Sequence, residues 1–82
     1  MAYVEIYTKT GCPYARHAKE MLEQHGMSYV ERNVSESPRL LSEMRERAGR
    51  ETSPQVFIDA RHIGGSDDLA TFLEQEGAGA SP

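Results

Sequence analysis

The most reactive side chain of this sequence is its single cysteine, Cys12, which stands directly before Pro13 in the stretch TGCPYAR. A thiolate is a strong nucleophile, a ligand for metals and a partner in thiol–disulfide exchange. A lone cysteine is more often a small, inert residue of the core. Which of these roles Cys12 has depends on the elements that position it.

The local pattern places Cys12 between a strand and a helix. Residues 3–7 alternate apolar and polar side chains and predict a strand, and Pro13 suits the first position of a helix over residues 13–25. Free N–H groups at a helix N-terminus, together with the charge of Lys9, favour a thiolate over a thiol. A lowered pKa hardly improves Cys12 as an attacking group, because nucleophilicity falls with pKa, but it makes Cys12 a better leaving group from a mixed disulfide.

The remaining pattern predicts a small α/β domain. Further strands are expected over residues 28–34, 55–58 and 62–63, and further helices over residues 38–48 and from Ser66 onward. The order is β-α-β-α-β-β-α, in which the first two strands must be parallel and the last two can form an antiparallel hairpin. The prediction is therefore a four-stranded mixed sheet with helices on both faces.

Length and composition restrict the function. Eighty-two residues make one domain, which we expect over residues 1–76, with a flexible tail over residues 77–82. The net charge of −4 argues against nucleic-acid binding, and the apolar runs are too short to span a membrane. The N-terminus lacks the pattern of a signal peptide, and one cysteine cannot form an internal disulfide. We expect a cytoplasmic monomer.

Four short motifs, in order and at near-family spacing, resemble those of a glutaredoxin, in particular the bacterial type with a Cys-Pro-Tyr-Cys site. They are Thr8-Lys9, Cys12-Pro13-Tyr14, Thr52-Ser53-Pro54 before Gln55-Val56-Phe57-Ile58, and Gly64-Gly65-Ser66-Asp67-Asp68. Each motif alone is weak, but together they cover residues 1–76. The resemblance implies a thioredoxin-like fold and thiol–disulfide exchange. It also implies glutathione as co-substrate, with glutathionylated proteins or small mixed disulfides as partners.

The resemblance also implies a site. Cys12 would be the catalytic residue, Lys9 would face the glycine carboxylate of glutathione, and Tyr14 would flank the mixed disulfide. A cis peptide bond before Pro54 would leave the Ser53 backbone free to pair with glutathione as an edge strand does. The expected glutathione-binding residues are Lys9, Cys12, Tyr14, Thr52, Ser53, Pro54, Gly65, Ser66 and Asp67.

Two of these residues begin the last predicted helix. Free N–H groups at Ser66 and Asp67 would receive the γ-glutamyl carboxylate, and the Asp67 carboxylate would accept from the ammonium group. Helix capping is the simpler role of the same two residues. The simpler alternative for Lys9 is an ordinary lysine on the solvated surface, without a part in binding.

Ala15 stands where many glutaredoxins carry a second cysteine. Releasing a protein disulfide by the two-thiol route needs that resolving cysteine, whereas removing glutathione from a glutathionylated thiol needs only Cys12. We therefore predict that the one-thiol reaction persists and the two-thiol reaction is lost or weak. Ser66 likewise stands where some relatives have a cysteine. Together these residues favour a variant from which spare thiols were removed.

Two other functions stay open at this stage. The chain could carry an iron–sulfur cluster between two copies, ligated by Cys12 and the sulfur of glutathione. It could also be a redox-inactive binding domain with an ordinary thiol pKa. For His17, His25 and His62 we expect surface or packing roles and no metal site. The stretch Arg45-Glu46-Arg47 predicts a solvated helix face.

Overall fold

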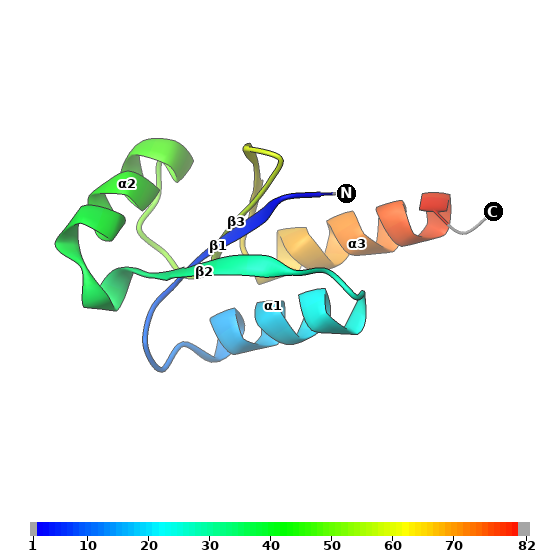
Figure 1. Cartoon of the computed structure of the whole chain (residues 1–82), viewed down its shortest axis with the longest axis horizontal. Helices are drawn as coiled ribbons and strands as arrows, with labels where there is room; N and C mark the ends of the chain where they lie inside the picture. Colours follow the sequence, from blue (N-terminus) through cyan, green and yellow to red (C-terminus); the bar gives the residue numbers. More distant parts are fainter. Residues whose placement is uncertain (1, 81–82) are drawn as a thin grey trace.

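The computed structural model describes the backbone of residues 2–80 and the side chains of residues 2–75. In chain order the elements are β1 (Val4–Thr8), α1 (Pro13–Gln24), β2 (Tyr29–Asn33), a 3-10 turn η1 (Val34–Glu36), α2 (Pro38–Ala48), β3 (Gln55–Ile58), β4 (Arg61–Gly64) and α3 (Ser66–Ala80) (Figure 1). This confirms the predicted order of strands and helices.

The four strands form one mixed sheet in the order β2-β1-β3-β4. β1 runs parallel to β2 and antiparallel to β3, and β3 pairs with β4 as an antiparallel hairpin. The strand–helix–strand start therefore makes the expected crossover. The fold is thioredoxin-like, as the sequence predicted.

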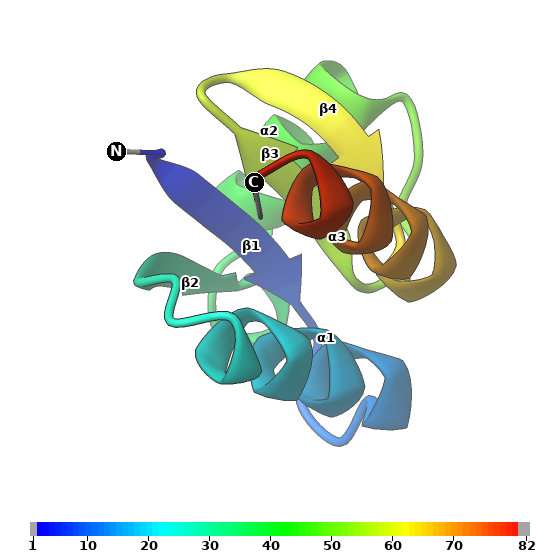
Figure 2. The same cartoon turned by 90° about the vertical axis from the view of Figure 1, so that its right-hand side faces the viewer.

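Helices cover both faces of the sheet, and each face has its own core (Figure 2). α1 and α3 pack on one face, where Ala18, Leu22, Leu69 and Leu73 meet apolar side chains of the central strands. α2 packs on the other face, where Met44 joins a second apolar cluster. Both cores lie against β1, so this strand is buried along its whole length, and it leads directly into the loop that carries Cys12.

Element ends differ slightly from the sequence prediction. β2 stops at Asn33 because its side chain accepts a hydrogen bond from the Ser35 N–H (2.8 Å) and starts the 3-10 turn. The β3–β4 turn consists of Asp59 and Ala60, both at positive φ (51° and 68°), which matches the twist of a two-residue hairpin. α3 extends to Ala80, while residues 81–82 of the expected tail lie outside the described residues. The mobility of residues 77–82 stays a prediction.

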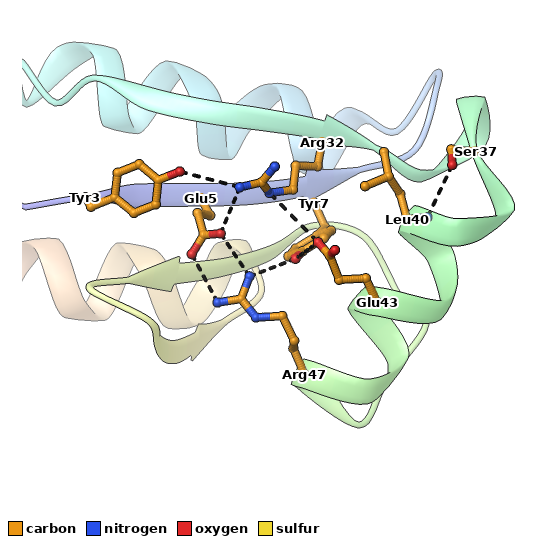
Figure 3. Close-up of polar contacts among 8 residues, drawn as sticks. All are labelled: Tyr3, Glu5, Tyr7, Arg32, Ser37, Leu40, Glu43 and Arg47. Atoms are coloured by element: carbon orange, nitrogen blue, oxygen red, sulfur yellow. Dashed lines mark hydrogen bonds and ion pairs between the residues drawn. The ribbon is translucent and has the colours of Figure 1, made fainter.

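The prediction of a solvated face at Arg45-Glu46-Arg47 is wrong for Arg47. Its guanidinium donates two parallel hydrogen bonds to the carboxylate of Glu5, both of 3.0 Å (Figure 3). The guanidinium lies 4.1 Å from the ring centroid of Phe57. It also donates to the Tyr7 hydroxyl at 2.7 Å, and Tyr7 donates to Glu43. Helical spacing could not show this, because the long side chain reaches back over the sheet.

Glu5 is the centre of this ionic cluster. Only 7% exposed, it also accepts a hydrogen bond from Arg32 at 3.0 Å. The hydrogen bond from Arg47 lowers the pKa of Glu5, and the hydrogen bond and charge of Arg32 lower it further. Together these effects outweigh burial, which by itself would raise the pKa, so the pKa of Glu5 lies below its ordinary value. The cluster therefore ties α2 and β2 to the central strand.

We predict that Glu5→Gln lowers the free energy of unfolding by about 1–3 kcal/mol near pH 7, between the values for exposed and buried ion pairs. Because the folded-state pKa is lowered, the contribution of Glu5 is complete above its unfolded-state value of about 4.3. It is lost as the pH falls through the lower folded-state pKa, so the two proteins should converge in acid. Urea titrations at several pH values measure this. Exposed Glu46→Gln is the matched control, and an equal effect there would contradict the assignment.

Candidate functional site

Cys12 lies at the N-terminus of α1, as the sequence predicted. It is the N-cap residue, with extended backbone angles (φ −84°, ψ 113°), and its carbonyl accepts the first helical hydrogen bond, from Arg16 (3.2 Å). Gly11, at φ +78°, turns the chain into this position. The half-buried thiol therefore sits where the helix N–H groups are free.

Three backbone and side-chain contacts join Cys12, Lys9 and Ser53 in a closed ring. The Cys12 N–H donates to the Lys9 carbonyl (3.2 Å), and the Lys9 N–H donates to the Ser53 hydroxyl (3.0 Å). The thiol of Cys12 in turn donates to the Ser53 carbonyl (3.5 Å). The loop after β1 is thereby fixed against the loop before β3.

This environment lowers the pKa of the Cys12 thiol. Burial alone would raise the pKa, but the Ser53 side chain, the N–H groups of Ala15 and Tyr14, and the charge of Lys9 together outweigh it. The helix N–H groups act by facing the sulfur, since no full capping bond is formed. The expected effect of the helix end and of Lys9 is thus present, and Ser53 adds a contribution that the sequence did not suggest.

A hollow of about 280 Å³ opens beside the thiol, and we call it the cis-proline hollow. The Ser53–Pro54 peptide bond is cis, which confirms that prediction. Seven of the nine residues predicted to bind glutathione line the hollow: Tyr14, Thr52, Ser53, Pro54, Gly65, Ser66 and Asp67. Tyr14 is 65% exposed and so is available to a ligand, as is exposed Asp67.

The other two predicted residues, Lys9 and Cys12, line a second hollow of about 190 Å³, which we call the thiol hollow. Arg16 and Lys19 of α1 also line it, together with Glu31 of β2, which pairs with Lys19 at 3.2 Å. Cations therefore surround the sulfur although the whole chain is acidic. Of the two hollows, only the thiol hollow is lined by Cys12 itself.

Sequence reasoning missed three residues of the cis-proline hollow: Arg50, Gln55 and Asp68. Gln55 is buried, and its amide donates to the Thr52 carbonyl (3.1 Å) and hydroxyl (3.0 Å) and accepts from His62 (2.6 Å). A polar residue at the start of an apolar strand was the available signal, because a buried amide requires partners.

The start of α3 closes the hollow through close backbone packing. A Cβ atom on Gly64 (φ +125°) would clash with the side chain of Asp68, so only glycine fits there without strain. Asp68 itself accepts from the Gly65 N–H (3.2 Å). The Gly65 backbone lies against Pro54, whose carbonyl would be 3.7 Å from an added Cβ. Glycine is therefore favoured at Gly64 by its packing on Asp68, whereas the distance at Gly65 is an ordinary van der Waals contact.

The described residues contain no group of three or more His, Cys, Asp and Glu side chains able to hold a metal ion. His17 and His25 are exposed, and His62 packs against Phe57 with 5.0 Å between the ring centroids. Among residues 2–80 no helix is both long and apolar enough to cross a bilayer.

A thiol of lowered pKa at a helix N-terminus, facing a cis-proline loop on a mixed four-stranded sheet, defines a thioredoxin-like redox domain. The family model described as Glutaredoxin matches residues 4–63. The chain belongs to the glutaredoxin family, whose members are generally oxidoreductases that use glutathione.

Known proteins support this assignment over most of the chain. Glutaredoxin 3 of Escherichia coli is 52% identical over 69 residues, covering 84% of this chain and 83% of that protein. The solution structure of a glutaredoxin from Brucella melitensis is 48% identical in sequence, with a TM-score of 0.78. The match covers 99% of this chain and 87% of the Brucella chain. The crystal structure of a buckwheat glutaredoxin–glutathione complex is 25% identical in sequence, with a TM-score of 0.77. The match covers 93% of this chain and 71% of the buckwheat chain.

Proposed function

We propose that this protein removes glutathione from glutathionylated thiols by a one-thiol reaction at Cys12. The observation that carries the proposal is the half-buried Cys12 thiol of lowered pKa beside the cis-proline hollow, with Ala15 one turn further along α1. Since the sequence contains no second cysteine, no internal disulfide can take part. We also propose that the protein acts as a monomer in the reducing cytoplasm.

The reaction has two balanced exchanges. In the first, the Cys12 thiolate attacks the glutathione sulfur of a mixed disulfide; the Cys12–glutathione bond forms, and the client sulfur leaves as a thiolate that takes up a proton. In the second, the thiolate of another glutathione attacks the glutathione sulfur bound to Cys12. Oxidised glutathione forms and Cys12 leaves as a thiolate. The client sulfur is thereby reduced to a thiol and the incoming glutathione is oxidised, so that it ends in oxidised glutathione together with the glutathione that came from the client.

The charges of the site suit the tripeptide. Glutathione carries two carboxylates and one ammonium group at its ends. Lys9 offers a cation in the thiol hollow, and Asp67 offers an anion in the cis-proline hollow, at the start of α3. The buckwheat relative was solved in complex with glutathione, which supports a glutathione site here. We assign the glycine carboxylate to Lys9 and the γ-glutamyl end to the start of α3.

Mass spectrometry after incubation with oxidised glutathione tests the proposal. We expect one stable adduct of glutathione on Cys12, which a second glutathione then removes. An ordinary free-cysteine pKa and no adduct would favour a redox-inactive domain. Visible absorbance and a doubled mass after anaerobic reconstitution with iron and sulfide would favour a cluster carrier.

We predict that Asp67→Ala raises the KM for glutathione about three- to tenfold and leaves the pKa of Cys12 nearly unchanged. The reason is that Asp67 lines the cis-proline hollow, whereas the groups that lower the thiol pKa lie elsewhere. Steady-state kinetics and an alkylation pH profile measure the two effects. Glu74→Ala, an exposed acid further along α3, is the control. Equal losses of binding and of thiol ionisation would contradict this division of roles.

A further inference from the structure

The buried amide of Gln55 holds the loop that precedes β3. Gln55 is only 1% exposed, and its amide nitrogen donates to the carbonyl of Thr52 at 3.1 Å and to the hydroxyl of Thr52 at 3.0 Å. The pairing of β3 with β1 ends at Gln55, which is paired with Tyr7, so Thr52 lies beyond the paired residues of the strand. A side chain therefore fixes Thr52 at the point where the backbone pairing of the sheet has ended.

The orientation of this amide determines where the proton of its other partner lies. The Thr52 carbonyl can only accept, so the amide nitrogen of Gln55 must face Thr52 and the amide oxygen must face His62. His62 then donates to that oxygen through Nε2, at 2.6 Å. Burial and the charge of Arg50 lower the pKa of His62 against the charge of Asp68, so the ring is neutral near pH 7. The neutral ring is therefore the tautomer with its proton on Nε2.

His62 belongs to β4 and lies outside the cis-proline hollow. Its ring packs against Phe57 of β3 with 5.0 Å between the ring centroids, and this packing supports the imidazole in its position beside Gln55. Of the described residues, Thr52 and Gln55 line the hollow, whereas His62 does not. The hydrogen-bonded path from His62 to a ligand in the hollow therefore runs through the amide of Gln55.

We propose that His62 and Gln55 are positioning residues, which hold Thr52 so that its hydroxyl donates to an oxygen of the tripeptide bound in the cis-proline hollow. The side chains donate in one direction, from His62 to Gln55 and from Gln55 to Thr52. Because the Thr52 oxygen accepts from the amide, its own proton turns away from the amide and stays available to a ligand. Each bond polarises the next, which strengthens the last donor. The effect on glutathione rests on the proposed function, whereas the chain of hydrogen bonds does not.

The test compares His62→Met with His62→Gln in steady-state kinetics, because the two new side chains have the same length and only glutamine can donate to Gln55. We expect His62→Met to raise the KM for a glutathionylated peptide about three- to tenfold and to change kcat less than about twofold. His62→Gln should keep the KM within about twofold of the wild-type value. His25→Met, the same change at an exposed histidine, is the control and should leave the KM unchanged.

Thr52→Val and Thr52→Ser test the last donor of the chain. Valine matches threonine in shape but lacks the hydroxyl, so it should raise the KM about as much as His62→Met does, whereas serine should not. Because both changes interrupt the same chain, the double variant Thr52→Val with His62→Met should have about the KM of Thr52→Val alone. Two independent structural effects would multiply, and that result would overturn the proposal.

Nitrogen-15 NMR of the ligand-free protein tests the first donor without any reaction. We expect a neutral His62 ring near pH 7 with its proton on Nε2, and a proton on Nδ1 would overturn the proposal. Equal KM values for His62→Met and His62→Gln would overturn it as well. If the wild-type protein showed no deglutathionylation, the proposed function would fail, whereas a wild-type activity that none of these variants changes would refute the chain alone.

Discussion

Cys12→Ser is expected to reduce deglutathionylation to the uncatalysed rate, a loss on the order of 10³-fold or more. Both exchange steps pass through the Cys12 sulfur, and a serine hydroxyl neither ionises at neutral pH nor forms a mixed disulfide. The variant would have no thiol left to accept glutathione, since Cys12 is the single cysteine of the sequence. Release of glutathione from a glutathionylated model peptide, followed against time, measures the loss.

The fold of this variant should be intact, because oxygen replaces sulfur in a half-buried position and no internal disulfide depends on it. Far-UV circular dichroism and the Tm supply the control. A variant that keeps its fold and more than a tenth of the wild-type rate would show that Cys12 is not the nucleophile. The one-thiol mechanism would then be wrong.

Local signals in the sequence were sufficient for the elements of this fold. Pro13 and Pro38 mark the first turns of α1 and α2, and the apolar stripes of those helices give their buried faces. What the sequence could not give is the use of long polar side chains across the sheet. Glu5 follows the alternation of an amphipathic strand, yet it is buried, because Arg47 and Arg32 reach it from other elements.

In the candidate site, too, some features could be predicted from the sequence and others could not. The motifs identified seven residues of the cis-proline hollow because the resemblance carried their positions, and it also implied the cis bond before Pro54. The environment of the sulfur is a different matter, since it depends on contacts between residues about forty positions apart, such as Cys12 with Ser53. The buried amide of Gln55 is another example, because its contact with His62 depends on the pairing of β3 with β4.

Ala15→Cys is expected to create a two-thiol reaction, for which the sequence supplies only one of the two cysteines. Ala15 lies one helical turn after Cys12, lines the thiol hollow with it and is only 2% exposed. Residues three apart at a helix N-terminus have Cα atoms about 5–6 Å apart, within the range that a disulfide spans. A cysteine at this position would be shielded from bulk glutathione, so it would act on the Cys12 mixed disulfide and not as the first attacking group.

Two results should follow from this substitution. With oxidised glutathione, Ala15→Cys should give a protein two hydrogens lighter instead of the stable glutathione adduct, because the neighbouring thiol is present at an effective concentration of millimolar or more. Reduction of a protein disulfide should rise at least about tenfold over the present chain in an insulin-type turbidity assay. Ala18→Cys, which places a buried thiol one turn beyond and out of reach, is the control. If Ala15→Cys instead accumulated the same adduct and gained no disulfide reduction, the absence of a resolving thiol would not be what limits this protein to one-thiol chemistry.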